Sequence, residues 1–309
     1  MASPEPLAPS GALALPATGG RRSYWRKLSS HPFFWPGASL VTLVLLVALL
    51  APEIAPHPYW QIYPNSGLGP TGGPLPPQWS LRGFFLGTDW LGRDVLSRLV
   101  WSARISLQVG IFASAISGAV GLLIGLVSGY FGGWVDMVLM RFTDIMMGFP
   151  FLFFLILVIA LIGPSVEVIY MSMGLLSWQS IARFTRGQVL SVRRETYVDA
   201  AAAVGGSRSR IILRHIMPNI ITPVVVLASL SISGNIIYES TLSFLGIGVP
   251  DPIPSWGKMV SGGLSYLMVD PTLVLFPILA ISITTIGFNL LAEAFNATAN
   301  PRSQRRGRR

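Results

Sequence analysis

The sequence predicts an all-α, polytopic membrane protein with six transmembrane helices, on three observations. First, 51% of the 309 residues are hydrophobic and only 11% are charged, whereas soluble domains carry about 25% charged residues. Second, the apolar residues form uncharged runs long enough to cross a bilayer as helices, which satisfy their own backbone hydrogen bonds in lipid. Third, most of the 22 basic residues lie where six spans would place them on one side, as the positive-inside rule requires.

Composition excludes several kinds of chemistry. The chain has no cysteine, so disulfides, thiolate metal sites and a thiol nucleophile are absent. Its three histidines lack metal-ligand spacing, and the sequence contains neither a Ser–His–Asp arrangement nor a G-x4-GK[ST] phosphate loop. A net charge of +9 is compatible with nucleic-acid binding, but the basic residues lie beside apolar runs, which indicates cytoplasmic anchoring instead. We therefore expect no enzyme activity, catalytic residue, cofactor, metal or nucleic-acid partner.

The N-terminal segment is expected to be cytoplasmic. Residues 1–30 begin with a tract rich in Ala, Pro, Ser and Gly, which predicts disorder. Basic residues at the end of this segment precede an uncharged run from Leu28 to Pro52. A cleaved signal peptide is the competing interpretation, but the run is long and no clean small-residue cleavage site follows it. We therefore predict an uncleaved first span within residues 31–55, with its N-terminus inside.

Residues 56–103 are predicted to form an extracytoplasmic loop that ends in an amphipathic helix. Proline and glycine are frequent in its first part, which is typical of an extended loop. In its second part Thr88 is a plausible N-cap. Leu91, Val95 and Leu99 favour one face of a helix that would lie at the outer interface. Three charged residues are interpreted as a structural ion-pair cluster rather than a substrate site: Asp89, Arg93 and Asp94.

Residues 104–295 are predicted to form a core of five further membrane helices. The second span covers Ile105–Val135, and its glycines allow close helix packing in lipid. A glycine-rich turn leads to the third span, which ends at Ile162 and in which Arg141 and Asp144 are interpreted as a structural pair. The fourth and fifth spans are expected to begin at Glu167 and about Pro218, and the sixth follows Asp270 and Pro271. A loop or re-entrant piece is expected at Ser255–Val269 and a basic cytoplasmic tail at 296–309.

The fifth span is the most polar of the six. Ser233, Asn235 and Glu239 lie along it or near its outer end. Polar and ionisable residues within a membrane often mark substrate pathways, so these three are candidates for a translocation path. Such residues also form interhelical hydrogen bonds, and the sequence leaves both interpretations open.

The segment from Arg183 to Pro218 carries seven arginines between two apolar runs, which predicts a cytoplasmic loop. Its local pattern predicts two short helices. Thr196 and Asp199 fit a capping box for the first helix, and Gly205 ends it, because a left-handed conformation costs glycine little. Alanines on an exposed helix let another protein approach the backbone closely. The loop is therefore either a docking element for a cytoplasmic partner or an ordinary loop with good helix propensity.

The stretch DAAAAVG, followed by thirteen residues to a proline, resembles the EAA loop of ABC-importer permeases, whose pattern is E-A-A-x3-G-x9-I-x-L-P. The matching positions are Asp199, Ala200, Ala201, Gly205 and Pro218. Three positions depart from the pattern, with Asp199 for Glu, His215 for Ile and Met217 for Leu. Three further stretches are similar to the dipeptide, oligopeptide and nickel branch of that family: RHIMPN, LGTDWLGRDVLSRL and YESTLSFLGIGVPDP.

This resemblance covers about residues 80–295 and implies a permease of the type I ABC-importer fold, of the second-permease-subunit type. In that family the loop, here within residues 190–217, is the coupling helix that sits in a groove of the ATPase. The implied partners are a homologous second permease, two cytoplasmic ATPase domains and an extracytoplasmic substrate-binding protein that delivers peptides. The implied location is the bacterial inner membrane, with both termini cytoplasmic. Nickel chelates and other small solutes remain alternative substrates.

Two other classes of function are less well supported. A membrane enzyme needs a paired catalytic constellation at membrane depth, and none is evident. A secondary transporter or channel usually shows internal repeats or several midplane charges, whereas the charges here lie near the span ends. Co-purification with an ATPase discriminates all three classes.

Overall fold

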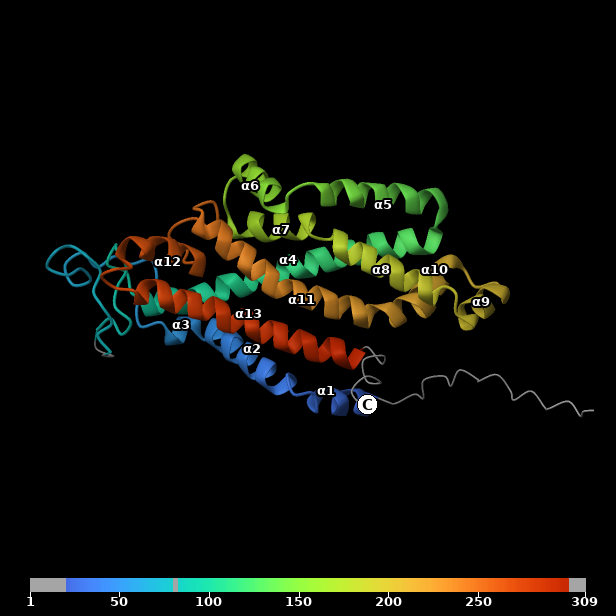
Figure 1. Ribbon diagram of the computed structural model, residues 1–309, viewed down its shortest axis with the longest axis horizontal. Coiled ribbons are helices and arrows are strands. Elements are labelled where there is room, and N and C mark those ends of the chain that lie inside the picture. Colours follow the sequence, from blue (N-terminus) through green and yellow to red (C-terminus); the bar gives the residue numbers. More distant parts are fainter. Residues whose placement is uncertain (1–20, 80–82, 300–309) are drawn as a thin grey trace, which may run out of the picture.

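The computed structural model describes residues 21–79 and 83–299, and the regular structure in those ranges is helical (Figure 1). The predictions for residues 1–20 and for the tail beyond residue 299 lie outside the described residues. The elements in chain order are α1 (Arg21–Ser29), α2 (Phe34–Leu49), α3 (Ala51–Ile54), α4 (Val95–Phe131), α5 (Gly133–Gly148), α6 (Phe151–Ile162), α7 (Val166–Leu176), α8 (Gln179–Val192), α9 (Thr196–Ala203), α10 (Arg208–Ile211), the π-helical turn η1 (Ile212–Ile216), α11 (Met217–Phe244), α12 (Trp256–Gly263), the 3-10 turn η2 (Leu264–Tyr266) and α13 (Thr272–Ala299).

The long helices run roughly along one axis of an elongated bundle (Figure 1). The loop between α3 and α4 gathers with α12 at one end of the bundle, and α1, α9 and α10 lie toward the opposite end. The described segments that the arginine distribution predicts to be cytoplasmic therefore lie toward one end of the bundle. Those predicted to be outside lie at the other end. The orientation of this axis across the membrane stays a prediction.

Three helical runs of the described residues are long and apolar enough to cross a membrane: α4, the run Arg208–Phe244 that includes α11, and Thr272–Thr298 of α13. The helices α5 and α6 qualify only as a pair, which is bent by 86°. The helices α2 and α7 are apolar but shorter. The helical membrane fold is therefore confirmed, and the count of six spans stays a prediction.

The central helix is α4, which packs against α2, α7, α8 and α11. Its glycines permit the close helix packing that the sequence predicts. A Cβ atom at Gly129 would lie 2.8 Å from the Cβ of Val189, and one at Gly110 would lie 2.8 Å from a side-chain carbon of Ile236. Both separations are shorter than the 3.5–4.0 Å or so at which carbon atoms pack. Larger side chains at these positions would push α8 and α11 away from α4.

The predicted amphipathic helix beginning at Thr88 is wrong. The second span is one continuous helix that starts at Val95, and its N-cap is Asp94, whose carboxylate accepts a hydrogen bond from the Ser97 N–H at 2.7 Å. Thr88 is instead buried in the preceding loop, where its hydroxyl donates to the Gly67 carbonyl at 2.6 Å. Val95 is fully buried, so this stretch packs inside the protein instead of lying on an interface.

The third and fourth spans are interrupted, where the sequence predicts unbroken helices. The break between α5 and α6 falls at Phe149 and Pro150, because proline has no N–H for the helix and disfavours helical backbone at the residue before it. The break between α7 and α8 falls at Ser177, whose hydroxyl donates to a main-chain carbonyl one turn back. Beyond this break, α8 continues to Val192 and does not end near Arg183.

Residues 21–29 form α1, although the sequence predicts disorder for all of residues 1–30. Leu28 is fully buried, in a helix that packs against α2 and α13. The junction to α2 is fixed by Trp35, whose indole Nε1 donates to the Ser29 carbonyl at 3.0 Å. Apolar burial therefore orders a segment whose composition is polar.

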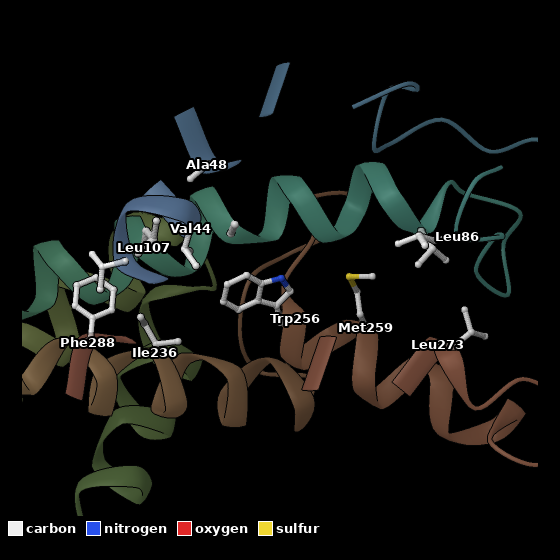
Figure 2. Close-up of a cluster of buried hydrophobic side chains, with 12 residues drawn as sticks. Val44, Ala48, Leu86, Leu107, Ile236, Trp256, Met259, Leu273 and Phe288 are labelled. Carbon is white, nitrogen blue, oxygen red and sulfur yellow. The ribbon is translucent and has the colours of Figure 1, made fainter. Parts of the chain in front are cut away.

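The short helix α12 is held by a hydrophobic cluster centred on Trp256 (Figure 2). Trp256 and Met259 point from α12 toward α4, and the Trp256 Nε1 donates to the Leu99 carbonyl at 3.0 Å. Side chains of α2, α4, α11 and α13 complete the cluster, among them Val44, Leu107, Ile236, Leu273 and Phe288. The segment predicted as an outer loop or re-entrant piece is thus a helix packed firmly against the long helices.

Candidate functional site

The helices α9 and α10 are joined by a glycine turn at the end of the bundle opposite α12 (Figure 1). Gly205 has a φ angle of 80°. The Gly206 N–H donates to the Ala201 carbonyl at 3.1 Å, and the Gly205 N–H donates to the Ala202 carbonyl at 3.0 Å. These are the two hydrogen bonds of a Schellman motif. The helix end predicted from the sequence is therefore confirmed.

The predicted capping box at α9 is wrong. This helix begins after Glu195, whose side chain makes no capping hydrogen bond, and Thr196 is already helical. Asp199 lies exposed in the first turn, where a carboxylate still interacts favourably with the positive end of the helix dipole. At α10 the Ser207 hydroxyl is the cap, because it accepts a hydrogen bond from the Arg210 N–H at 3.4 Å.

One face of α9 is anchored and the other is exposed. Val198 is buried in a cluster with Val189, Ile211, Ile216 and Ile220. Ala201, one turn further, packs partly against the same cluster. Ala200 is exposed, and Val204 at the end of the helix is 86% exposed. Of the two alanines that match the family pattern, Ala200 therefore faces outward and Ala201 faces the protein.

A hollow of about 500 Å³ lies between α9 and the α10–η1 run. Three basic side chains contribute to its lining: Arg210, Arg214 and His215. Tyr197 also lines it and accepts a hydrogen bond from Asn219 Nδ2 at 3.1 Å. Partial burial, with Glu195 nearby, raises the pKa of Tyr197 above its usual value. The hollow is therefore positively charged and suited to an acidic group of another protein.

The loop is joined to α11 by continuous helix. The helix α10 passes through the π-helical turn η1 directly into α11. Pro218 lies in the first turn of α11, as the sequence predicts. Because proline lacks an N–H, the ordinary helical hydrogen bond is lost at that point. The adjacent turn η1 is π-helical, a rare form that occurs mostly as single turns within α-helices. The glycine turn and α11 are therefore linked by helix without a break.

On its other side, the loop is continuous with α8, which two arginines tie to α5. Arg186 donates through Nε and Nη2 to the two carboxylate oxygens of Asp136, at 2.6 Å each. Arg183 forms an ion pair with Asp144. The predicted pairing of Arg141 with Asp144 is wrong, because the partner comes from another helix 39 residues away.

The three polar residues of α11 proposed from the sequence lie inside the helix packing. Ser233 donates to Asn289 Oδ1 of α13 at 2.6 Å, and Asn235 Nδ2 donates to the Ser114 hydroxyl of α4 at 2.9 Å. Both are almost fully buried. Their partners belong to other helices, which favours the interhelical hydrogen-bond interpretation over direct contact with a substrate.

The carboxylate of Glu239 is surrounded by serine hydroxyls that donate hydrogen bonds to it. Glu239 is fully buried, and its carboxylate accepts hydrogen bonds from Ser106 of α4 at 3.1 Å, from Ser243 of α11 at 2.8 Å and from Ser255 before α12 at 2.7 Å. Several hydrogen bonds offset part of the cost of burying a carboxylate. The residue therefore links α11 to α4 and to the segment that precedes α12.

An open groove of about 330 Å³ runs between α4 and α11. Small residues line it on both helices, including Gly118 and Ala119 of α4 and Ala228 and Ser229 of α11. The sequence did not predict this groove. The available signal was the occurrence of small residues on two spans, but their pairing depends on the tertiary arrangement.

The ion-pair cluster predicted near the start of α4 is confirmed in part. Arg93 Nε donates to Asp89 at 2.7 Å, and Arg98 Nε lies 3.4 Å from the same carboxylate. Asp94 serves as the helix cap instead. Asp251, from the loop before α12, lies 3.8 Å from Arg93. Among the described residues no group of three or more His, Cys, Asp or Glu side chains is placed to hold a metal ion.

Comparison with known proteins adds two family matches. Residues 121–305 match the family described as binding-protein-dependent transport system inner membrane component. Residues 21–77 match the N-terminal TM domain of oligopeptide transport permease C.

Individual relatives cover most of the chain. The dipeptide transport system permease protein DppC of Alkalihalophilus pseudofirmus is 34% identical over 97% of this chain and 96% of the relative. The oligopeptide transport system permease protein OppC of Escherichia coli is 41% identical over 86% of this chain and 87% of the relative. The glutathione transport system permease protein GsiD of Shigella dysenteriae is 34% identical over 90% of this chain and 89% of the relative.

Proposed function

Because the chain belongs to the family of binding-protein-dependent transport system inner membrane components, we propose that it is a permease subunit of an ATP-driven importer of di- or oligopeptides. The observation that carries the proposal is the similarity, over nearly the whole chain, to permeases named for dipeptide, oligopeptide and glutathione transport. These names favour peptides over nickel chelates as the substrate. As a transport subunit, the chain relies on separate ATPase chains for hydrolysis.

The helices α9 and α10, with the glycine turn between them, are the proposed contact with the ATPase and are called the α9–α10 loop. Ala200 and Val204 present a small exposed surface. Both also line the hollow, which carries Arg210 and Arg214 for acidic groups. When ATP draws the two ATPase domains together, the loop moves with them. Since α8 and α11 are attached to the two ends of this loop, its displacement reorients the long helices as rigid bodies.

The proposed assembly contains a homologous second permease, two cytoplasmic ATPase domains and an extracytoplasmic binding protein in the bacterial inner membrane. Both termini are cytoplasmic in this proposal, on the side of α9. The substrate path lies between the two permeases. Ser233, Asn235 and Glu239 then affect the path through the helices that they join, since they are buried within this subunit.

Reconstitution of the complete importer tests this function. The chain is co-expressed with its second permease, ATPases and binding protein, purified, and inserted into vesicles, and the uptake of labelled peptides of two to five residues is measured. We expect the ATPases to copurify and uptake to require ATP. Uptake that depends on an ion gradient and not on ATP would support a secondary transporter and contradict the proposal.

A further inference from the structure

The helix α5 packs against α4 and α8, and most of its residues are exposed or half-buried. Thr143 is its only buried residue among those described. Phe142 stacks on Trp178 at the start of α8, with ring centroids 6.0 Å apart and planes inclined by 18°. Two ion pairs, those of Asp136 and Asp144, also link α5 to α8. Polar contacts therefore contribute to fixing α5 to α8.

The Asp136–Arg186 pair joins three helices. Both carboxylate oxygens of Asp136 accept hydrogen bonds from the Arg186 guanidinium at 2.6 Å, and the Ser128 hydroxyl of α4 donates to the same carboxylate. The Asp136 side chain is 19% exposed and that of Arg186 is 35% exposed. A two-point arginine–carboxylate contact fixes orientation as well as distance, so it resists rotation of α5 about its own axis.

The Asp144–Arg183 pair is a second point of attachment. Asp144 lies eight residues beyond Asp136, which is about 12 Å along a helix. Both partners are nearly half exposed, at 47% for Arg183 and 45% for Asp144, and exposed pairs contribute little to folding. Two separated attachments nevertheless fix the direction of a helix, which a single contact does not.

We propose that α5 and α8 move as one unit, and that these two ion pairs are positioning contacts that carry motion of the α9–α10 loop to the break between α5 and α6. The proposal rests on the proposed function, because it assigns a task to α8 in coupling. At the far end of α5 the break at Phe149 borders a hollow of about 220 Å³, which is also lined by Phe151, Ser177 and Tyr238. A shift of α5 changes the shape of this hollow, which α6, α11 and the α7–α8 junction share.

A crosslink tests whether the two helices move together. The chain has no cysteine, so the double variant Asp144→Cys with Arg183→Cys offers a single defined pair of thiols. Loss of the ion pair is expected to lower peptide uptake per ATP hydrolysed, and a short bifunctional thiol-reactive crosslinker that alkylates both cysteines is expected to restore it. If the crosslink lowers the ratio further, or leaves it unchanged, α5 and α8 do not move as one unit.

Charge reversal tests the inner pair. Asp136→Arg and Arg186→Asp are each expected to lower uptake per ATP hydrolysed by about fivefold or more, the lower end of typical coupling between sites. The double reversal is expected to regain part of the loss. The matched control is Arg141→Asp, which reverses an exposed charge on the same helix that makes no ion pair among the described residues. It is expected to leave the ratio unchanged.

The measurements separate this proposal from failures of folding and of the proposed function. Each ratio is taken on purified complex, so reduced assembly does not alter it. If a charge reversal prevents assembly, Arg186→Lys keeps the charge, loses the two-point contact, and is expected to give a smaller loss of the ratio. If the charge reversals do not assemble and Arg186→Lys leaves uptake per ATP hydrolysed unchanged, the proposal is overturned. A wild-type complex without ATP-dependent uptake contradicts the proposed function, whereas a transporting wild type with variants of equal ratio contradicts only the coupling through α5.

Discussion

Replacing Gly205 with alanine tests whether the glycine turn positions α9. Gly205 has a φ angle of 80°, and a left-handed backbone costs an L-residue with a Cβ roughly 1–2 kcal/mol. No steric term is added, because nothing lies within 4 Å of the position of the new Cβ. That cost lowers the equilibrium ratio of molecules with the turn formed to molecules with the turn broken by about 5–30-fold. We therefore expect Gly205→Ala to weaken the ATPase contact while the long helices stay folded.

Two measurements on the purified complex detect the destabilised turn in Gly205→Ala. Hydrogen exchange at the Gly205 and Gly206 amides, which close the turn, is expected to accelerate, and less ATPase is expected to remain bound. The control is Gly187→Ala in the middle of α8, where a Cβ also meets nothing within 4 Å and alanine favours the helix by roughly 0.5–1 kcal/mol. If Gly205→Ala matches this control in both measurements, the left-handed turn does not position the loop.

Three further predictions concern the exposed face of α9, the interior of α11 and the topology. Ala200→Trp adds bulk to the exposed face of α9 and is expected to reduce copurifying ATPase with the chain still inserted in the membrane; full binding would exclude this face as the contact. Asn235→Leu removes the 2.9 Å hydrogen bond to Ser114, a loss of about 0.6 kcal/mol for an average interhelical bond in a membrane. We expect slightly less assembled complex with unchanged uptake per complex, and reduced uptake per complex would favour the path interpretation. A reporter inserted within Pro64–Pro77 is expected to lie outside, and a cytoplasmic signal would contradict the six-span topology.

Features that depend on a single residue's backbone were predictable from the sequence. The left-handed turn at Gly205 and the place of Pro218 in the first turn of α11 follow from what glycine and proline permit. The close packing along α4 also follows, because small residues recur where α8 and α11 approach.

Features that depend on tertiary contacts were not predictable. Thr88 and Asp94 both satisfy the N-cap rule, and only the folded loop, in which Thr88 bonds to Gly67, decides between them. Asp144 has an arginine three residues away in sequence, yet its partner Arg183 comes from α8. Polar residues on α11 indicate neither which face they occupy nor which helix covers it.

The burial of α9 shows the same limit at the candidate site. The family pattern selects Ala200 and Ala201 equally, because both match it. Only the cluster formed by Val198 and its neighbours turns Ala201 inward. Sequence therefore identified the loop, and packing identified the surface that it presents.

The most direct test of the central claim is a site-specific crosslink from the loop to the ATPase. Val204→Cys places the chain's single thiol on a side-chain position that is 86% exposed beside the glycine turn. Met268→Cys is the matched control, because that position is 98% exposed but lies between α12 and α13 at the opposite end. With a thiol-attached photocrosslinker in the assembled importer, the account predicts a covalent product with the ATPase from position 204 and none from position 268. No product from position 204, or an ATPase product from position 268, would contradict the assignment of the α9–α10 loop as the coupling element.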